Sequence, residues 1–121
     1  MQTRDTRSME AGEDLSAAQF HFVTLESDGK VDLADSAGEN CHGILLNKPD
    51  AADKAATVAI SGRCLVEAGG TVAAGAALQT NATGEAITAA AGDYITGCAL
   101  EACVDGEIIA MELIQGGNSV A

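Results

Sequence analysis

Aromatic side chains are nearly absent from this chain, which has two phenylalanines, one tyrosine and no tryptophan among its 121 residues. Aromatic residues normally bury the largest apolar areas in a core. The core must therefore be assembled from Val, Ile, Leu and many Ala residues, each of which buries little surface. We expect such a protein to gain stability by docking or oligomerising, because a partner that binds only the folded state stabilises it. A modestly stable monomer is the alternative.

Basic residues are also scarce, with six Lys and Arg against eighteen Asp and Glu, so the formal net charge is −12 at pH 7. No Lys or Arg follows Arg63. Nucleic acids and anionic membranes are bound through clusters of Lys and Arg. We therefore expect no nucleic acid and no membrane as a partner. The acidic surface serves solubility and self-repulsion, or attracts a basic partner.

Long apolar runs are missing too, and those present are far shorter than a membrane span. The first residues, MQTRDTRSMEAGEDL, contain no apolar stretch typical of a signal peptide. We expect synthesis in the cytosol, where cysteines stay reduced. The four cysteines lack CxxC pairs and zinc-ligand spacing, so no metal or cofactor is expected. They are expected to be small buried apolar residues.

Glycine and short apolar runs are frequent in the sequence. The stretch around which the chain is organised extends from Ala56 to Leu78. This stretch predicts an apolar strand at Thr57–Ile60, a break, and a second strand from Arg63 to Val66. A corner rich in glycine follows, from Gly69 to Gly75. Glycine disfavours helix but suits tight turns and close backbone approaches in a small β domain.

Turn signals recur along the rest of the chain, with Asp-Gly pairs at residues 28–29 and 105–106 that favour hairpins. Further strands are expected at Gln19–Leu25, Val31–Leu33, Gly43–Leu46, Glu85–Thr88, Tyr94–Ala102 and Glu107–Ile114. The pattern predicts an all-β fold, a small β-barrel or sandwich of short strands with an extended N-terminal arm. Residues 1–18 are expected to form the arm, disordered or ordered only by a neighbour, residues 19–115 the β domain, and residues 116–121 a polar tail.

No motif for catalysis is found. The two histidines, His21 and His42, lie outside any recognisable nucleophile motif, and acidic pairs are too common to identify an acid–base couple. The glycines after Gly69 lack the Lys-Ser/Thr of a phosphate loop. We therefore expect a protein that is not an enzyme.

One alternative assigns chemistry to Lys54. The segment Asp53-Lys54-Ala55, followed by an apolar strand and then by residues 70–78, GTVAAGAAL, resembles a biotinyl or lipoyl carrier domain. In that family a lysine at a hairpin tip carries the prosthetic group. This sequence departs from the family at Thr71, which replaces an aspartate, and it lacks the upstream corner element.

A second resemblance extends over residues 12–114. It is carried by the order of these segments: EDLSAAQF at 13–20, GILLNKP at 43–49, ATVAISG at 56–62, VEAGGTVAAG at 66–75, GCALEA at 97–102 and DGEIIAM at 105–111. Together they resemble the capsid cement, or head decoration, proteins of tailed bacteriophages and prophages.

The resemblance implies a structural virion protein, made in the bacterial cytoplasm, that binds the outer surface of an expanded capsid. Its expected partners are the major capsid protein, whose subunits it would bridge, and further copies of itself in a homotrimer. An extended arm can add a strand to the sheet edge of a neighbour. The expected capsid-binding residues are therefore those of the arm: Gln2, Thr3, Arg4, Asp5, Thr6 and Arg7. An arm whose charges only keep it solvated is the alternative.

Overall fold

The runs of Val, Ile and Ala form strands, and the expected all-β class is confirmed. A computed structural model describes residues 4–39, 41–90 and 93–113. Within these ranges there is no helix, and hence none able to cross a membrane. The strands are β1 Arg4–Glu10, β2 Phe22–Leu25, β3 Val31–Leu33, β4 Gly43–Leu45, β5 Ala55–Glu67, β6 Ala77–Thr80, β7 Ala86–Thr88, β8 Gly97–Ala99 and β9 Ile108–Leu113.

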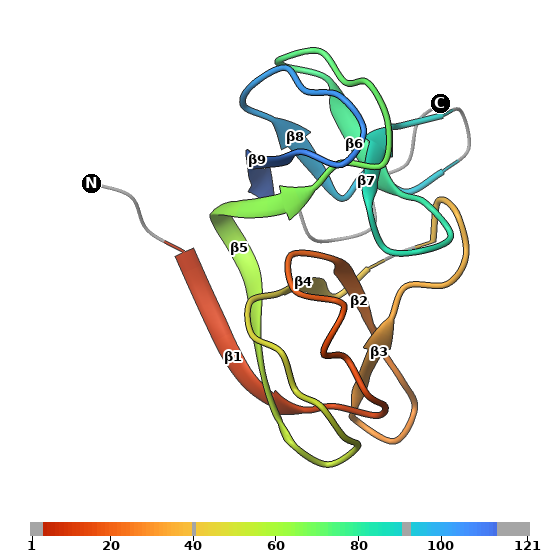
Figure 1. The fold of residues 1–121 in the computed structure, drawn as a ribbon, viewed down its shortest axis with the longest axis vertical. Helices are drawn as coiled ribbons and strands as arrows, with labels where there is room; N and C mark the ends of the chain where they lie inside the picture. The colour runs from red at the N-terminus through yellow and green to blue at the C-terminus, as the bar shows by residue number, and fades with distance from the viewer. Residues whose placement is uncertain (1–3, 40, 91–92, 114–121) are drawn as a thin grey trace.

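All nine strands belong to one sheet, in which every strand pair is antiparallel. The order is β3-β2-β4-β5-β9-β8-β6-β7, and β1 also pairs with β5. Figure 1 shows the sheet curled into a lower half, with β1 to β4, and an upper half, with β6 to β9. Between barrel and sandwich, the curvature favours the barrel-like arrangement.

The stretch that organises the chain is β5, which runs through both halves (Figure 1). The sequence predicted two strands here with a break between them, and this detail is wrong, because Ala55–Glu67 is one 13-residue strand. The expected break is a change of partner at Gly62, where φ is 89°. Before Gly62 the strand pairs with β1 and β4, and after it with β9.

The two halves repeat the same arrangement of strands. We call the first unit 1 (β1 to β4 and the first part of β5) and the second unit 2 (the last part of β5 and β6 to β9). In unit 1, Val23 pairs with Leu33 and Gly43, and in unit 2 Leu78 pairs in the same way with Thr88 and Gly97. Each unit is closed by a parallel bridge, Ala11 to Val31 in one and Ala68 to Ala86 in the other.

The core follows the same repeat. Buried residues of unit 1 have buried counterparts at equivalent positions of unit 2, which pair as Ala11 with Ala68, Leu15 with Val72, Val23 with Leu78, Val31 with Ala86, Leu45 with Ala99, Ala56 with Ile109, and Val58 with Met111. Most of these side chains are small, and Phe22 is the largest that is fully buried. The lean core expected from the composition therefore follows the repeat, although its larger cluster joins the units, with Phe22 and Ile44 of unit 1 in the same cluster as Met111 of unit 2.

The expected absence of strand structure near the N-terminus is wrong for residues 4–10, which form β1. This strand pairs with β5 of its own chain, from Arg4 opposite Gly62 to Glu10 opposite Ala55. The residues that follow are also part of the fold, because Ala11 and Leu15 are fully buried. An extended segment is present, but it lies along the sheet (Figure 1).

Two glycines mark close crossings of strands. A Cβ atom at Gly43 of β4 would lie 2.1 Å from the carbonyl oxygen of Ala59, and one at Gly97 of β8 would lie 2.9 Å from that of Glu112. The sequence predicted a bulge or close crossing at Gly97, and the crossing is found. The strand around it is shorter than the expected Tyr94–Ala102, because only Gly97–Ala99 pairs with neighbouring strands, with β9 throughout and with β6 at Gly97 and Cys98.

Candidate functional site

The arm residues predicted to bind a capsid fall in two groups. Gln2 and Thr3 lie outside the described residues. The backbones of Arg4, Asp5, Thr6 and Arg7 belong to β1. Thr6 and Arg7 are exposed, and the Arg7 guanidinium donates a hydrogen bond to the backbone carbonyl of Thr6 at 3.4 Å.

The outer edge of β1 is the first candidate docking surface. Among the described strands, β1 pairs only with β5, so one edge of its ladder has no strand partner. Such an edge presents backbone N–H and C=O groups to any added strand. β1 can therefore still add a strand to the sheet of a neighbour, as predicted, but it does so as an edge strand already paired with β5.

An apolar patch on the outer face of unit 2 is the second candidate. Leu65 of β5 and Ile108 of β9 lie diagonally across this strand pair, and both point away from the core. Leu100 is adjacent, because its backbone N–H bonds to the carbonyl of Ala110. These three side chains are 42, 49 and 43% exposed in the order Leu65, Ile108, Leu100. We call them the β5–β9 patch.

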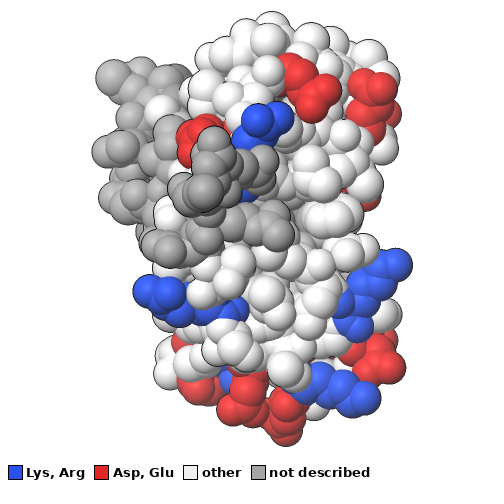
Figure 2. Space-filling model, turned by 90° about the vertical axis from the view of Figure 1, so that its left-hand side faces the viewer, with Lys and Arg blue, Asp and Glu red and all other residues white. Residues whose placement is uncertain are grey.

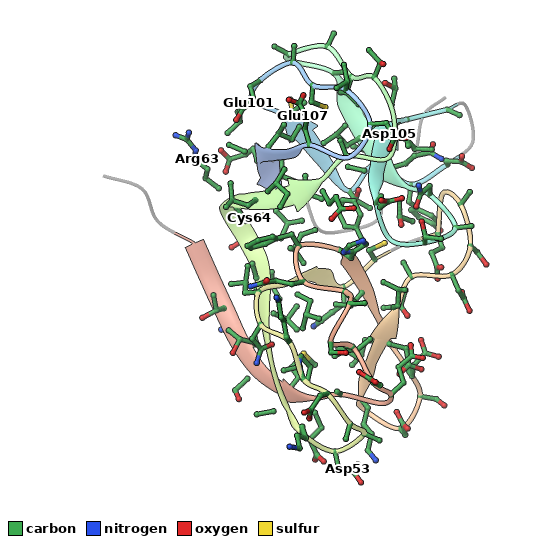
Figure 3. All side chains as sticks on the ribbon, in the orientation of Figure 1. Asp53, Arg63, Cys64, Glu101, Asp105 and Glu107 are labelled. Carbon is green, nitrogen blue, oxygen red and sulfur yellow. The ribbon has the colours of Figure 1, made fainter. Side chains whose placement is uncertain are left out.

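Charged side chains surround this part of the surface. In Figure 2 acidic side chains gather at the lower end and in the upper part of the face on the β1 side, and Lys and Arg side chains lie between them. Figure 3 shows Arg63 projecting from β5 away from the sheet, with Glu101 and Glu107 at the upper end and Asp53 at the lower end. An apolar face rimmed by charge is typical of a protein–protein interface.

The junction between the units is tightly packed. The turn between β6 and β7 rests on unit 1, where the Phe22 N–H bonds to the Gly84 carbonyl at 2.7 Å. A Cβ at Gly84 would lie 2.6 Å from Leu33 and 3.2 Å from His21. The equivalent turn of unit 1 contains Gly29, which has no neighbouring atom within 4 Å of such a Cβ. Unit 1 therefore has an open end at the place where unit 2 is covered.

Three of the four cysteines are buried, as expected from the sequence. Cys41, Cys64 and Cys103 are buried, Cys98 is partly exposed, and none of the four forms a disulfide. Burial, together with the charge of Glu39, raises the pKa of Cys41 to about 12, and burial also raises the pKa of Cys103. These thiols are therefore protonated and poor nucleophiles at neutral pH.

Lys54, the attachment residue of the carrier alternative, lies in the turn that precedes β5. Its ammonium is 3.1 Å from a carboxylate oxygen of Asp50, and both side chains are well exposed. An exposed ion pair of this kind contributes little to stability.

One constellation was missed in the sequence. His21 precedes β2, Glu67 ends β5, and Glu85 precedes β7, yet one ligand atom from each lies within 4.8 Å of the others. The three come from distant parts of the chain, so no local motif signals them. A hydrogen bond with Glu85, followed by burial, raises the pKa of Glu67. Burial would also raise the pKa of Glu85, but hydrogen bonds led by that from Asn81 outweigh burial and lower it.

No protein-family model and no curated protein sequence matches the chain. Among solved structures, it is similar to the crystal structure of the head fiber gp8.5 N base of bacteriophage phi29. The superposition covers 96% of this chain and 98% of that chain, with a TM-score of 0.74 at 14% sequence identity. The two chains share one fold. The phi29 protein is described as the base of a head fiber, so the comparison gives no support to the carrier alternative at Lys54.

Proposed function

We propose that this chain is a structural protein of a tailed-phage virion that binds the outer surface of the expanded capsid and stabilises it by bridging major capsid protein subunits. The observation that carries the proposal is the shared fold with the phi29 head fiber base over nearly the whole length of both chains. The order of sequence segments resembles that of capsid decoration proteins, which supports the same role. The proposed role is structural and assigns no catalysis and no cofactor to the chain.

The surface of the molecule is consistent with docking on a larger assembly. The open edge of β1 can add to a sheet of a capsid subunit through backbone hydrogen bonds. The arginines of this strand, Arg4 and Arg7, can pair with carboxylates of the same subunit. The β5–β9 patch supplies apolar area beside it. Many identical weak contacts on a lattice sum to strong stabilisation, because neighbouring contacts hold each subunit in place.

A homotrimer is part of the proposal. The turn of unit 2 covers the start of β2 in unit 1, whereas the turn at Gly29 is open. The same contact between molecules would place Gly29 of one copy on the start of β6 in the next copy. A head-to-tail contact of this kind closes into a ring when its rotation permits. A trimer would then contain a ring of alternating units.

The experiment uses empty expanded capsids assembled from the major capsid protein of the phage or prophage whose genome encodes this chain. Purified chain should add to these shells at a saturable stoichiometry and raise their melting temperature. The double variant R4E/R7E should add at least about tenfold more weakly, because it reverses two charges on the docking edge. Sedimentation of shells with bound protein measures the addition, and calorimetry measures the melting temperature.

The matched control is the double variant K48E/K54E, which makes the same change of net charge on two other exposed lysines. It should add like the unchanged protein. Failure of the unchanged protein to add to the shells would refute the capsid role. Equal addition by R4E/R7E would remove the arm from the docking surface and leave the β5–β9 patch as its site.

A further inference from the structure

The cluster of His21, Glu67 and Glu85 is built like an incomplete metal centre. His21 is only 9% exposed. Its Nδ1 lies 3.0 Å from the carbonyl oxygen of Gln19, and because a carbonyl only accepts, Nδ1 must carry the proton and donate it. In the neutral ring Nε2 then has a free lone pair, which faces the Glu67 carboxylate at 3.9 Å. Metal-binding histidines are normally oriented by this kind of bond to a carbonyl.

The carboxylates are also held in place. One oxygen of Glu85 accepts hydrogen bonds from the Asn81 amide at 3.2 Å and from the Thr83 hydroxyl at 2.9 Å. The Glu85 carboxylate also forms a hydrogen bond with that of Glu67, so a metal ion would take the place of the proton between them. Glu67 lies against Glu85, and the negative charge of Asp105 also acts on it. Acidic groups gathered in this way repel one another unless a proton or a cation lies between them.

Comparison of the units shows what is missing in unit 2. In unit 1 the counterparts of Glu67 and Glu85 are Glu10 and Lys30, as their equivalent backbone bonds show. The Lys30 ammonium forms an ion pair with Asp53 and also lies in the field of Glu10. In unit 1 the Lys30 ammonium is therefore the positive charge that lies among the carboxylates. In unit 2 a glutamate replaces the lysine and Gly106 replaces Asp53, while His21 contributes a nitrogen.

We propose that His21 Nε2 and the carboxylates of Glu67 and Glu85 bind one Zn²⁺ ion at the junction between the two units. One nitrogen and two carboxylate oxygens form a ligand set that zinc accepts, with water in the fourth position. Tetrahedral zinc with bonds of about 2.1 Å places ligand atoms about 3.4 Å apart, so the three atoms, now within 4.8 Å of one another, must move closer together on binding. Magnesium and calcium prefer all-oxygen sites with more ligands.

The ion would join segments that are distant in sequence. His21 belongs to unit 1, Glu85 belongs to unit 2, and Glu67 ends the strand shared by both. Zinc binding to the folded chain would therefore stabilise the contact between the units. This inference does not depend on the capsid role, since it rests on residues inside one chain.

The test uses the full, metal-free chain with Zn²⁺ alone, followed by calorimetric titration and thermal unfolding. We expect one ion per chain and a higher melting temperature. The E85Q variant should bind at least about tenfold more weakly, because the loss of even an outer-shell partner costs 10-fold or more. E10Q, altered at the unit 1 counterpart of Glu67, should bind like the unchanged protein.

Cysteines are the competing zinc ligands, and Co²⁺ distinguishes them. The absorption spectrum of the Co²⁺ form should lack thiolate charge-transfer bands in the near ultraviolet. The H21Q variant should lose the visible absorption of bound Co²⁺. The proposal would be overturned by absence of zinc binding, by equal binding in E85Q, or by thiolate bands that persist in H21Q. Because E85Q alters a partly exposed residue, it should fold even if H21Q does not.

Discussion

At the scale of single residues, equivalent positions in the two units differ where their surroundings differ. Lys30 and Glu85 occupy the same place in their turns, but Lys30 forms an ion pair with Asp53, whereas Glu85 lies against Glu67. Asp53 and Gly106 both have positive φ, at 71° and 89°. The repeat therefore conserves backbone geometry while side chains change, and this allows one junction to gain a histidine–carboxylate cluster.

Gly84 is the glycine whose replacement should cost most. A G84A variant must place a methyl group at φ 80°, against Leu33, His21 and the carbonyl of Phe22. We expect a loss of about 3 kcal/mol in the free energy of unfolding, from left-handed strain and displaced contacts together. Urea denaturation measures it. G106A is the control, because φ there is 89° with nothing within 4 Å, and it should lose only about 1 kcal/mol.

Equal losses in these two variants would contradict the tight junction between the units. They would show that backbone strain alone sets the cost at Gly84.

At the scale of elements, β1 shows what sequence patterns miss. Its residues, RDTRSME, contain one apolar side chain, so neither alternation nor strand propensity is visible. The strand exists because the first part of β5 offers it a ladder. By contrast, the β2–β3 hairpin was predictable, since the turn chemistry of Asp28-Gly29 is local. The last strand was predictable as well, and its alternating Ile109, Met111 and Leu113 are buried.

Removal of residues 1–10 should therefore unfold or strongly destabilise the domain. The deletion uncovers β5 at Ala56 and Val58, and it removes Met9, which packs against the unit 1 core. We expect the free energy of unfolding to fall by at least about 2 kcal/mol, the scale of one or two buried apolar side chains. Thermal unfolding followed by circular dichroism measures the change.

Removal of residues 1–3 alone is the control, and it should leave the melting temperature unchanged. If the longer deletion also left the melting temperature unchanged, β1 would contribute nothing to stability. The prediction from the sequence that residues 1–18 form an arm would then hold.

At the scale of the whole molecule, two lean cores share one long strand. The smaller buried cluster, in unit 1, is mostly Ala and Val, while the larger one takes residues from both units, and β5 joins the units so that neither is a separate domain. The formal charge of −12 keeps copies apart unless specific contacts hold them. Specific contacts at the open end of unit 1 or at the β5–β9 patch must therefore offset this repulsion.

The proposed trimer predicts a sedimenting mass three times that of one chain. An S27R variant, altered in the open turn beside Gly29, should shift the equilibrium toward monomer by placing a bulky charged side chain in the contact. Analytical ultracentrifugation measures the distribution. S27A is the control at the same position and should remain trimeric. A chain that is monomeric both alone and on capsids would refute the ring.

Local chemistry in the sequence was sufficient for the all-β class, the hairpin turns, the buried cysteines and the lean core, because each depends on residue type or on near neighbours. The tertiary structure alone decided that β5 is continuous, that residues 4–10 form a strand, and that His21, Glu67 and Glu85 converge. These features depend on pairing between segments far apart in the chain, and such pairing leaves no periodic signal in any single segment. The two-unit repeat was hidden for a related reason: its halves agree in backbone bonds and buried volume, and few of their residues are identical.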